Sequence, residues 1–138
     1  MKLYYYKNPD GVKNFGDDLN PWLWARFLPG LVDTTSGDTL FVGIGTLLND
    51  RLPVSNKTIV FSTGVGYGTS LPKVNDSWAI YCVRGPLSAQ KLKLPKEVAV
   101  TDGAVLIRRI YSNSLPKKFH YSYINKEDLM RSIFILLL

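Results

Sequence analysis

Short apolar runs separated by polar turns are the dominant pattern along this chain of 138 residues. Most of these runs are apolar without strict alternation, which is typical of strands that are covered on both faces. The pattern therefore favours a parallel sheet with helices on both sides, an α/β, Rossmann-like domain of three layers. The predicted strands are residues 3–6, 39–44, 58–62, 78–83 and 98–101.

Helix signals lie between some of these runs, and they predict helices at residues 17–27 and 86–94, with a short helical turn at 47–52. Asp17 or Asp18 is the expected cap of the first helix, with Pro21 tolerated in its first turn. Pro95 forces the end of the second helix. A further strand at 119–124 and a helix that starts after Asn125 are also expected.

The length of the chain is enough for one ordinary domain and too short for two. We expect residues 1–124 to form that domain and residues 125–138 to be an atypical tail. The last residues are apolar, so we expect the tail to need a partner surface or a missing segment to cover it.

The net charge of +6 is unevenly placed along the chain. Residues 1–69 carry six Lys or Arg and six Asp or Glu, whereas residues 70–138 carry eleven and five. This excess suits an anionic ligand such as a phosphorylated sugar, a nucleotide or phosphoenolpyruvate, and also nucleic acid or an anionic membrane surface. The alternative is that the basic residues only form a solubilising surface. The aromatic residues do not interleave with Lys and Arg as in single-strand binders, so we predict no nucleic-acid partner.

Several classes of protein are disfavoured by what the sequence contains. The one cysteine, Cys82, stands in the apolar run 78–83 and is expected to be a buried structural thiol. The one histidine, His120, has no second ligand beside it in the sequence, so no metal site is predicted. No signal peptide is visible and the apolar tail is too short to span a bilayer, so we expect a cytoplasmic protein.

Polar residues follow the first predicted strand in the segment 14–19, which reads NFGDDL. Gly16 lets the backbone approach a ligand closely, and the Asn14 amide offers the donor and acceptor that sugar hydroxyls require. The alternative is that Asp17 and Asp18 only cap the helix while Asn14 fills a turn.

Two glycine-rich segments follow the second and third strands. Gly43 and Gly45, with Thr46 after them, permit a phosphate or sugar to lie against the backbone. The third glycine of the dinucleotide fingerprint is missing, and no Walker sequence is present, which argues against a P-loop nucleotide hydrolase. The second segment, GVGYG at 64–68, is interpreted as a flexible lid, a substrate loop or a plain loop.

The segment RGPLSA at 84–89 follows the fourth strand and is the most specific of the set. Arg84 is positioned to offer a forked pair of donors to a carboxylate or phosphate, and Ser88 adds a hydroxyl in the first helical turn. The alternative is that Arg84 packs against the sheet edge or pairs with a neighbouring acid. Asp102, at the end of the fifth predicted strand, is a candidate to bind a hydroxyl, act as a base or cap the next element.

Taken in order, the segments at 14–19, 43–46, 84–89 and 101–104 resemble the polysaccharide pyruvyl transferase family over residues 1 to about 124. Members resemble two-domain transferases of the GT-B type and move a pyruvyl group from phosphoenolpyruvate to a sugar, forming a ketal on a surface glycan. The resemblance implies an N-terminal domain, no cofactor beyond phosphoenolpyruvate as donor, and a glycan or lipid-linked sugar as acceptor. It implies that Arg84 serves the phosphoenolpyruvate site and that Asn14, Gly16 and Asp17 shape the cleft. With the residue patterns above, we predict catalytic roles for Arg84 and Asp102. We predict substrate-binding roles for Asn14, Gly16, Asp17, Gly43, Gly45, Thr46 and Ser88.

The second domain of that family has no counterpart in this sequence. We therefore expect a truncated or frameshifted product or a fragment, weakly active or inactive alone, whose site faces a missing domain or a second copy. Peripheral association with membrane-bound glycan assembly is a further expectation. The alternative is a non-catalytic module of the same fold that binds a sugar or nucleotide sugar.

Overall fold

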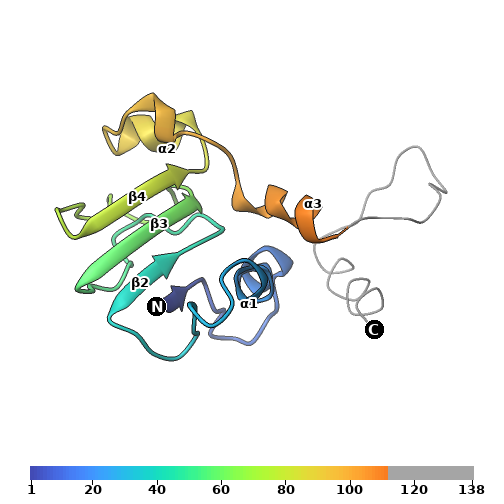
Figure 1. The fold of residues 1–138 in the computed structure, drawn as a ribbon. Helices are drawn as coiled ribbons and strands as arrows, with labels where there is room; N and C mark the ends of the chain where they lie inside the picture. The colour runs from blue at the N-terminus through green and yellow to red at the C-terminus, as the bar shows by residue number, and fades with distance from the viewer. Residues whose placement is uncertain (112–138) are drawn as a thin grey trace.

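Four parallel strands form one sheet in the computed structural model, which describes residues 1–111 (Figure 1). They are β1 (Lys2–Tyr4), β2 (Thr39–Val42), β3 (Lys57–Thr63) and β4 (Trp78–Val83), hydrogen-bonded in the order β1-β2-β3-β4. Two helices join this sheet, α1 (Phe15–Phe27) and α2 (Pro86–Lys91). The predicted α/β, Rossmann-like class is confirmed. The predictions for His120, the strand at 119–124 and the tail lie outside the described residues.

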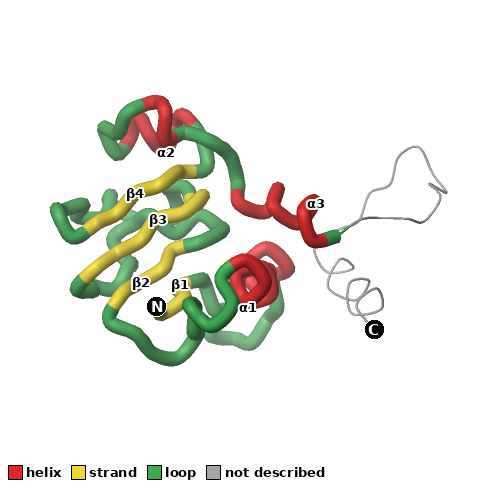
Figure 2. The backbone as a smooth tube through the Cα atoms, viewed as in Figure 1, coloured by secondary structure: helices red, strands yellow, loops and turns green. Residues whose placement is uncertain are grey.

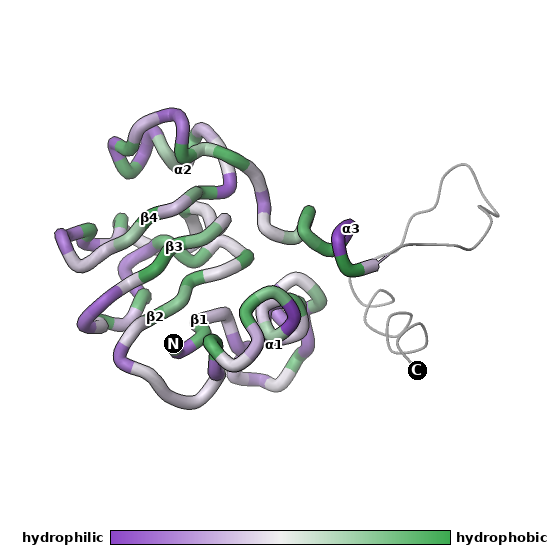
Figure 3. The backbone as a smooth tube through the Cα atoms, viewed as in Figure 1, coloured by the Kyte–Doolittle hydropathy of each residue, from purple (hydrophilic) through white to green (hydrophobic). Residues whose placement is uncertain are grey.

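Both faces of the sheet are covered at β2, as the unbroken apolar runs predict (Figure 2). At β4 one face is open, because Tyr81 is exposed there. On β2, Leu40 and Val42 pack in a cluster with Ala89 of α2, while Phe41 between them packs with Leu23 of α1. Figure 3 shows hydrophobic segments within β2 and β3 and hydrophilic ones in the loops outside the sheet. Each fully buried aliphatic side chain contributes roughly 1.5–3 kcal/mol to folding.

Helix α1 begins earlier than predicted. Asn14 is its N-cap, and the Asn14 Oδ1 accepts the Gly16 N–H at 3.0 Å. The predicted caps, Asp17 and Asp18, instead lie in the first turn, where carboxylates are favoured by the helix dipole. Pro21 is consequently in the middle of the helix, not in its first turn. Because proline has no N–H, the Asp17 carbonyl loses its usual partner four residues on.

The connections after β2 and β3 contain no helix. The helical turn predicted at 47–52 is wrong, because Leu48 instead forms a parallel bridge with Val65. These two loops still complete the core, since Leu47 and Leu48 are buried against the same face of the sheet as Ala89.

The chain after β4 departs from the prediction in two places. Helix α2 ends at Lys91, before the proline expected to end it, and short elements follow: η1 (Lys96–Val98), η2 (Gly103–Leu106) and α3 (Ile107–Ile110). The fifth strand predicted at 98–101 is wrong. The Val98 and Ala99 N–H groups close the η1 turn onto Pro95 and Lys96, so only one bridge, between Ala99 and Val83, continues the sheet.

Candidate functional site

Parallel strands end at the same edge of a sheet, and β2, β3 and β4 bring three predicted segments together there. Arg84 follows β4, and its Nη1 donates to the Thr46 Oγ1 at 2.7 Å and to the Gly45 carbonyl at 3.5 Å. Gly64, directly after β3, lies against the same guanidinium. We call these four residues, Gly45, Thr46, Gly64 and Arg84, the Arg84 shelf.

The Gly45 carbonyl holds the shelf together by accepting several donors. The Gly64 N–H donates to it at 2.9 Å, and the Thr63 hydroxyl at 3.0 Å, in addition to Arg84. The Thr63 Oγ1 also accepts the Leu47 N–H at 3.3 Å. Hydrogen bonds from Thr63 and Gly64, at the end of β3, thus hold the loop that follows β2 in place.

Gly64 is a glycine because the arginine occupies the space of a side chain. A Cβ there would lie 2.7 Å from the guanidinium carbon of Arg84. That guanidinium is half-buried and its two hydrogen-bond partners are neutral. Within residues 1–111 no carboxylate pairs with it, and its Nε and Nη2 donate to no protein group. Among the described residues this forked pair of cationic donors, which lies against Gly64, has no acceptor, and such a fork suits an oxyanion.

Ser88 connects α2 to this edge of the sheet. Its buried Oγ accepts the Val65 N–H at 3.2 Å, next to Gly64 of the Arg84 shelf. The position in the first turn of α2 is as predicted. The hydroxyl therefore holds the loop after β3, and a substrate-binding role for Ser88 stays a prediction.

The glycine cluster at 64–68 is fastened to the loop that follows β2. The Asn49 Nδ2 donates to the Gly66 carbonyl at 3.0 Å, and the Asp50 N–H to the Ser70 carbonyl at 3.2 Å. The Asp50 carboxylate also accepts the Thr69 hydroxyl, and this hydrogen bond lowers the pKa of Asp50. Of the interpretations left open, a plain anchored loop fits these contacts best.

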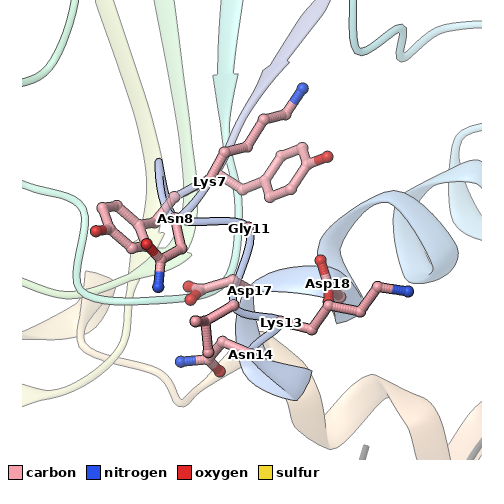
Figure 4. A pocket seen from close by; sticks show the side chains of 10 residues that line it. Lys7, Asn8, Gly11, Lys13, Asn14, Asp17 and Asp18 are labelled. Carbon is pink, nitrogen blue, oxygen red and sulfur yellow. The ribbon is translucent and has the colours of Figure 1, made fainter.

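A second feature lies at the start of α1, where a pocket of about 280 Å³ opens beside the loop after β1 (Figure 4). In Figure 4 the Asn14 and Asp17 side chains extend to one side of the helix start, and Asp18 lies on the other side with Lys13. Of the three site residues predicted in this segment, Asn14 and Asp17 line the pocket, whereas Gly16 is exposed beside them and is not part of the lining. The pocket is lined by Tyr5, Tyr6, Lys7, Asn8, Gly11, Val12, Lys13, Asn14, Asp17 and Asp18.

Gly43 has a packing reason to be a glycine. A Cβ there would lie 2.2 Å from the Trp24 Nε1 and 2.6 Å from the Asn20 Oδ1. Both side chains come from α1, so the helix approaches the end of β2 over the bare backbone. The predicted role of Gly43 in admitting a substrate is not needed to explain the residue and stays a prediction.

Asn20 is a fully buried polar residue that our sequence reasoning missed. Its Nδ2 donates to the carbonyls of Asp17 at 3.2 Å and Ile44 at 3.0 Å. Its Oδ1 accepts the Ile44 N–H at 2.8 Å and the Trp24 Nε1–H at 3.1 Å. The only local signal for this role is an amide directly before a proline inside an apolar helix.

Asp102 caps η2, and its Oδ1 accepts the Ala104 N–H at 2.9 Å. The next residue, Gly103, is buried where a Cβ would lie 3.0 Å from the Ser62 Cβ, at the end of β3. Asp102 is therefore near the carboxyl edge of the sheet, but no hydrogen bond or ion pair joins it to Arg84. Capping is observed, and a catalytic role stays a prediction.

Cys82 is buried as predicted, with its Sγ 3.3 Å from the Ser62 Oγ. No helix among residues 1–111 has the length and apolar character that crossing a bilayer requires. Within the same residues, no three His, Cys, Asp or Glu side chains gather as metal ligands.

One curated relative is similar to most of the chain. Over 126 residues the chain is 43% identical to the succinoglycan biosynthesis protein ExoV of Rhizobium meliloti (strain 1021), an alignment that covers 83% of this chain and 39% of that protein. The chain therefore spans about two fifths of the length of this relative. No protein-family model matches the chain. No solved structure matches it.

Proposed function

We propose that this chain forms the N-terminal domain of a polysaccharide pyruvyl transferase of the GT-B type, acting in the biosynthesis of an exopolysaccharide. The observation that carries the proposal is the free fork of the Arg84 guanidinium at the carboxyl edge of a parallel sheet. Similarity to a succinoglycan biosynthesis protein over most of the chain supports the assignment to glycan synthesis. The resemblance of the segments at 14–19, 43–46, 84–89 and 101–104 supports pyruvyl transfer.

The proposed donor is phosphoenolpyruvate, which carries a phosphate and a carboxylate. Nε and Nη2 of Arg84 match the spacing of two oxygens on either group, because guanidinium donors are planar and parallel. Thr46 and the Gly45 carbonyl hold the other side of the guanidinium, at Nη1. Binding therefore requires little ordering of the arginine, which preserves affinity.

The proposed reaction places two sugar hydroxyls on one carbon of the donor. The methylene carbon of phosphoenolpyruvate gains a proton, both hydroxyl oxygens bond to the neighbouring carbon, and the carbon–oxygen bond to phosphate breaks. One hydroxyl proton balances the new methyl group and the other leaves with phosphate. The arginine stabilises the departing phosphate, a contribution that increases as charge develops.

The pocket at the start of α1 is the proposed place of the acceptor. Sugar hydroxyls need both donors and acceptors, and the pocket offers the Asn14 amide and the Asp17 carboxylate. Tyr6, which is exposed in the same lining, provides a flat face for a sugar ring, whereas the Tyr5 ring already lies under the Lys7 ammonium. Asp102 is the proposed acid or base, because its capping bond uses only Oδ1 and, among residues 1–111, no group bonds to Oδ2.

A titration followed by nuclear magnetic resonance tests this function against the binding-module alternative. Phosphoenolpyruvate is expected to shift the Gly45, Thr46 and Gly64 amide signals with saturation, and inorganic phosphate to compete. A nucleotide sugar that shifts the same signals at lower concentration than phosphoenolpyruvate would contradict the proposal and favour a sugar-nucleotide module. The absence of any saturable shift with phosphoenolpyruvate would also contradict it.

A further inference from the structure

Asn20 connects the two parts of the candidate site, the pocket at the start of α1 and the Arg84 shelf. Its side chain has no solvent exposure, and its amide makes four hydrogen bonds, which is its full capacity. Two donors face Oδ1 and two carbonyls face Nδ2, so the partners themselves determine the orientation of the amide. An aspartate of the same shape would place a second oxygen against those two carbonyls.

Pro21 explains why the amide is needed at this place. The proline removes the N–H that would bond to the Asp17 carbonyl, in the first turn of α1. The Asn20 Nδ2 donates to that carbonyl instead, at 3.2 Å. The side chain thereby replaces a backbone hydrogen bond of the helix and fixes the carbonyl of a residue that lines the pocket.

The other pair of hydrogen bonds holds the chain just after β2. Asn20 bonds to both the N–H and the carbonyl of Ile44, as a neighbouring strand would. Ile44 directly precedes Gly45 and Thr46, the two residues that accept hydrogen bonds from the Arg84 guanidinium. A continuous set of contacts thus runs from Asp17 through Asn20 and Ile44 to the Arg84 shelf.

We propose that Asn20 is a positioning residue, which sets the place of the Gly45 and Thr46 acceptors under Arg84 relative to the pocket at Asp17. It touches no substrate, and its effect on binding passes through Ile44. The inference rests on the proposed function for its ligand, phosphoenolpyruvate. Loss of the Asn20 amide is therefore expected to weaken anion binding at the Arg84 shelf even where the domain stays folded.

The variant Asn20→Asp separates positioning from a contribution to stability alone. Its Oδ1 keeps both donors, while Oδ2 donates to a carbonyl when protonated and repels both carbonyls when ionised. Burial raises the pKa of a carboxyl, so ionisation is expected between about pH 6 and about pH 8. The ratio of the variant's Kd for phosphoenolpyruvate to that of the wild type is expected to rise on the order of tenfold over this range.

Trp24→Phe is the matched control, because it removes one hydrogen bond to Asn20 and leaves both bonds to Ile44. It is expected to lower the stability of the domain while keeping the wild-type Kd for phosphoenolpyruvate at about pH 6 and at about pH 8. Asn20→Ser has no titratable group, and we expect it to bind weakly at every pH. A constant ratio in Asn20→Asp, an equal loss in Trp24→Phe, or wild-type affinity in Asn20→Ser would overturn the proposal.

Failure of the proposed function gives a different result from failure of this inference. If the wild type binds no phosphoenolpyruvate, the donor assignment fails, and the Thr46 amide and Arg84 side-chain NMR signals then test Asn20 without a ligand. These signals are expected to move with pH in Asn20→Asp and to keep their positions in Trp24→Phe. Signals in Asn20→Asp that do not move with pH would overturn the positioning role.

Discussion

The Arg84 Nη1 donates to the Thr46 hydroxyl at 2.7 Å, although 38 residues separate the two positions in the chain. This contact connects the loop after β2 to the residue after β4, across the end of the strand between them. It holds a cation at the carboxyl edge of the sheet, where α/β domains bind their ligands. The contact gives Arg84 a fixed place before any ligand arrives.

Thr46→Val is expected to weaken phosphoenolpyruvate binding about fivefold, the effect of one hydrogen bond of about 1 kcal/mol. Valine has the shape of threonine but accepts no hydrogen bond, so the guanidinium loses its shortest contact. Thr46→Ser retains the hydroxyl and is expected to bind as the wild type does. Calorimetry on the three chains measures the effect, and equal affinities in all three would show that the contact does not position Arg84.

Gly64→Ala is expected to displace the guanidinium and to weaken binding about tenfold while the fold persists. The added Cβ would lie 2.7 Å from the guanidinium carbon, and the backbone of Gly64 is not in the positive-φ region that only glycine adopts readily. Gly85→Ala is the control, since a Cβ there meets no atom within 4 Å. Circular dichroism verifies folding, and undiminished binding in Gly64→Ala would contradict the described packing.

Gly43→Ala is expected to destabilise the domain by about 1–3 kcal/mol through overpacking against α1. The new methyl group would press on the Trp24 indole and the Asn20 amide. Gly85→Ala is expected to cost less than about 1 kcal/mol, as it only changes the cap of a short helix. Urea unfolding followed by tryptophan fluorescence compares them, and similar midpoints would refute the packing role of Gly43.

Thr69→Val is expected to raise the pKa of the Asp50 carboxyl toward its ordinary value of 3.8, because the Thr69 hydroxyl bond is the largest cause of its lowering. A carboxyl whose pKa is lower in the folded chain stabilises the fold above its unfolded pKa and loses that contribution as pH falls through the folded one. The Asp50 contribution is therefore lost only below about pH 4. Carbon-13 NMR titration measures this pKa, with Thr69→Ser as control. An unchanged pKa in Thr69→Val would contradict the assignment.

The strands could be predicted because each is an apolar run, and this signal is local. The same signal failed at 98–101, where the turn after Pro95 takes the N–H groups of Val98 and Ala99 that a strand would offer to its neighbour. The start of α1 was misplaced because Asn14, Asp17 and Asp18 are all good caps in sequence. Only the packed helix shows which of them accepts the first N–H groups.

The candidate site likewise has features that local sequence predicts and features that depend on packing. Arg84 could be selected because an arginine between a buried strand and a proline-led helix is a local feature. Its contact with Thr46 and its packing on Gly64 were not predictable, since they depend on which loops the sheet brings together. Asn20 escaped notice because its partner Ile44 lies 24 residues away in the sequence.

Calorimetric titration of phosphoenolpyruvate into the wild type, Arg84→Ala and Arg26→Ala tests the central claim most directly. Arg26 is the charge-matched control, because it is an arginine in the last turn of α1 and not part of the Arg84 shelf. Its guanidinium carbon lies 4.0 Å from the centre of the Trp22 ring. We predict saturable binding in the wild type and in Arg26→Ala, and a loss of at least about tenfold in Arg84→Ala, the effect of a charged hydrogen bond. Equal affinity in Arg84→Ala, or no binding by the wild type, would contradict the account.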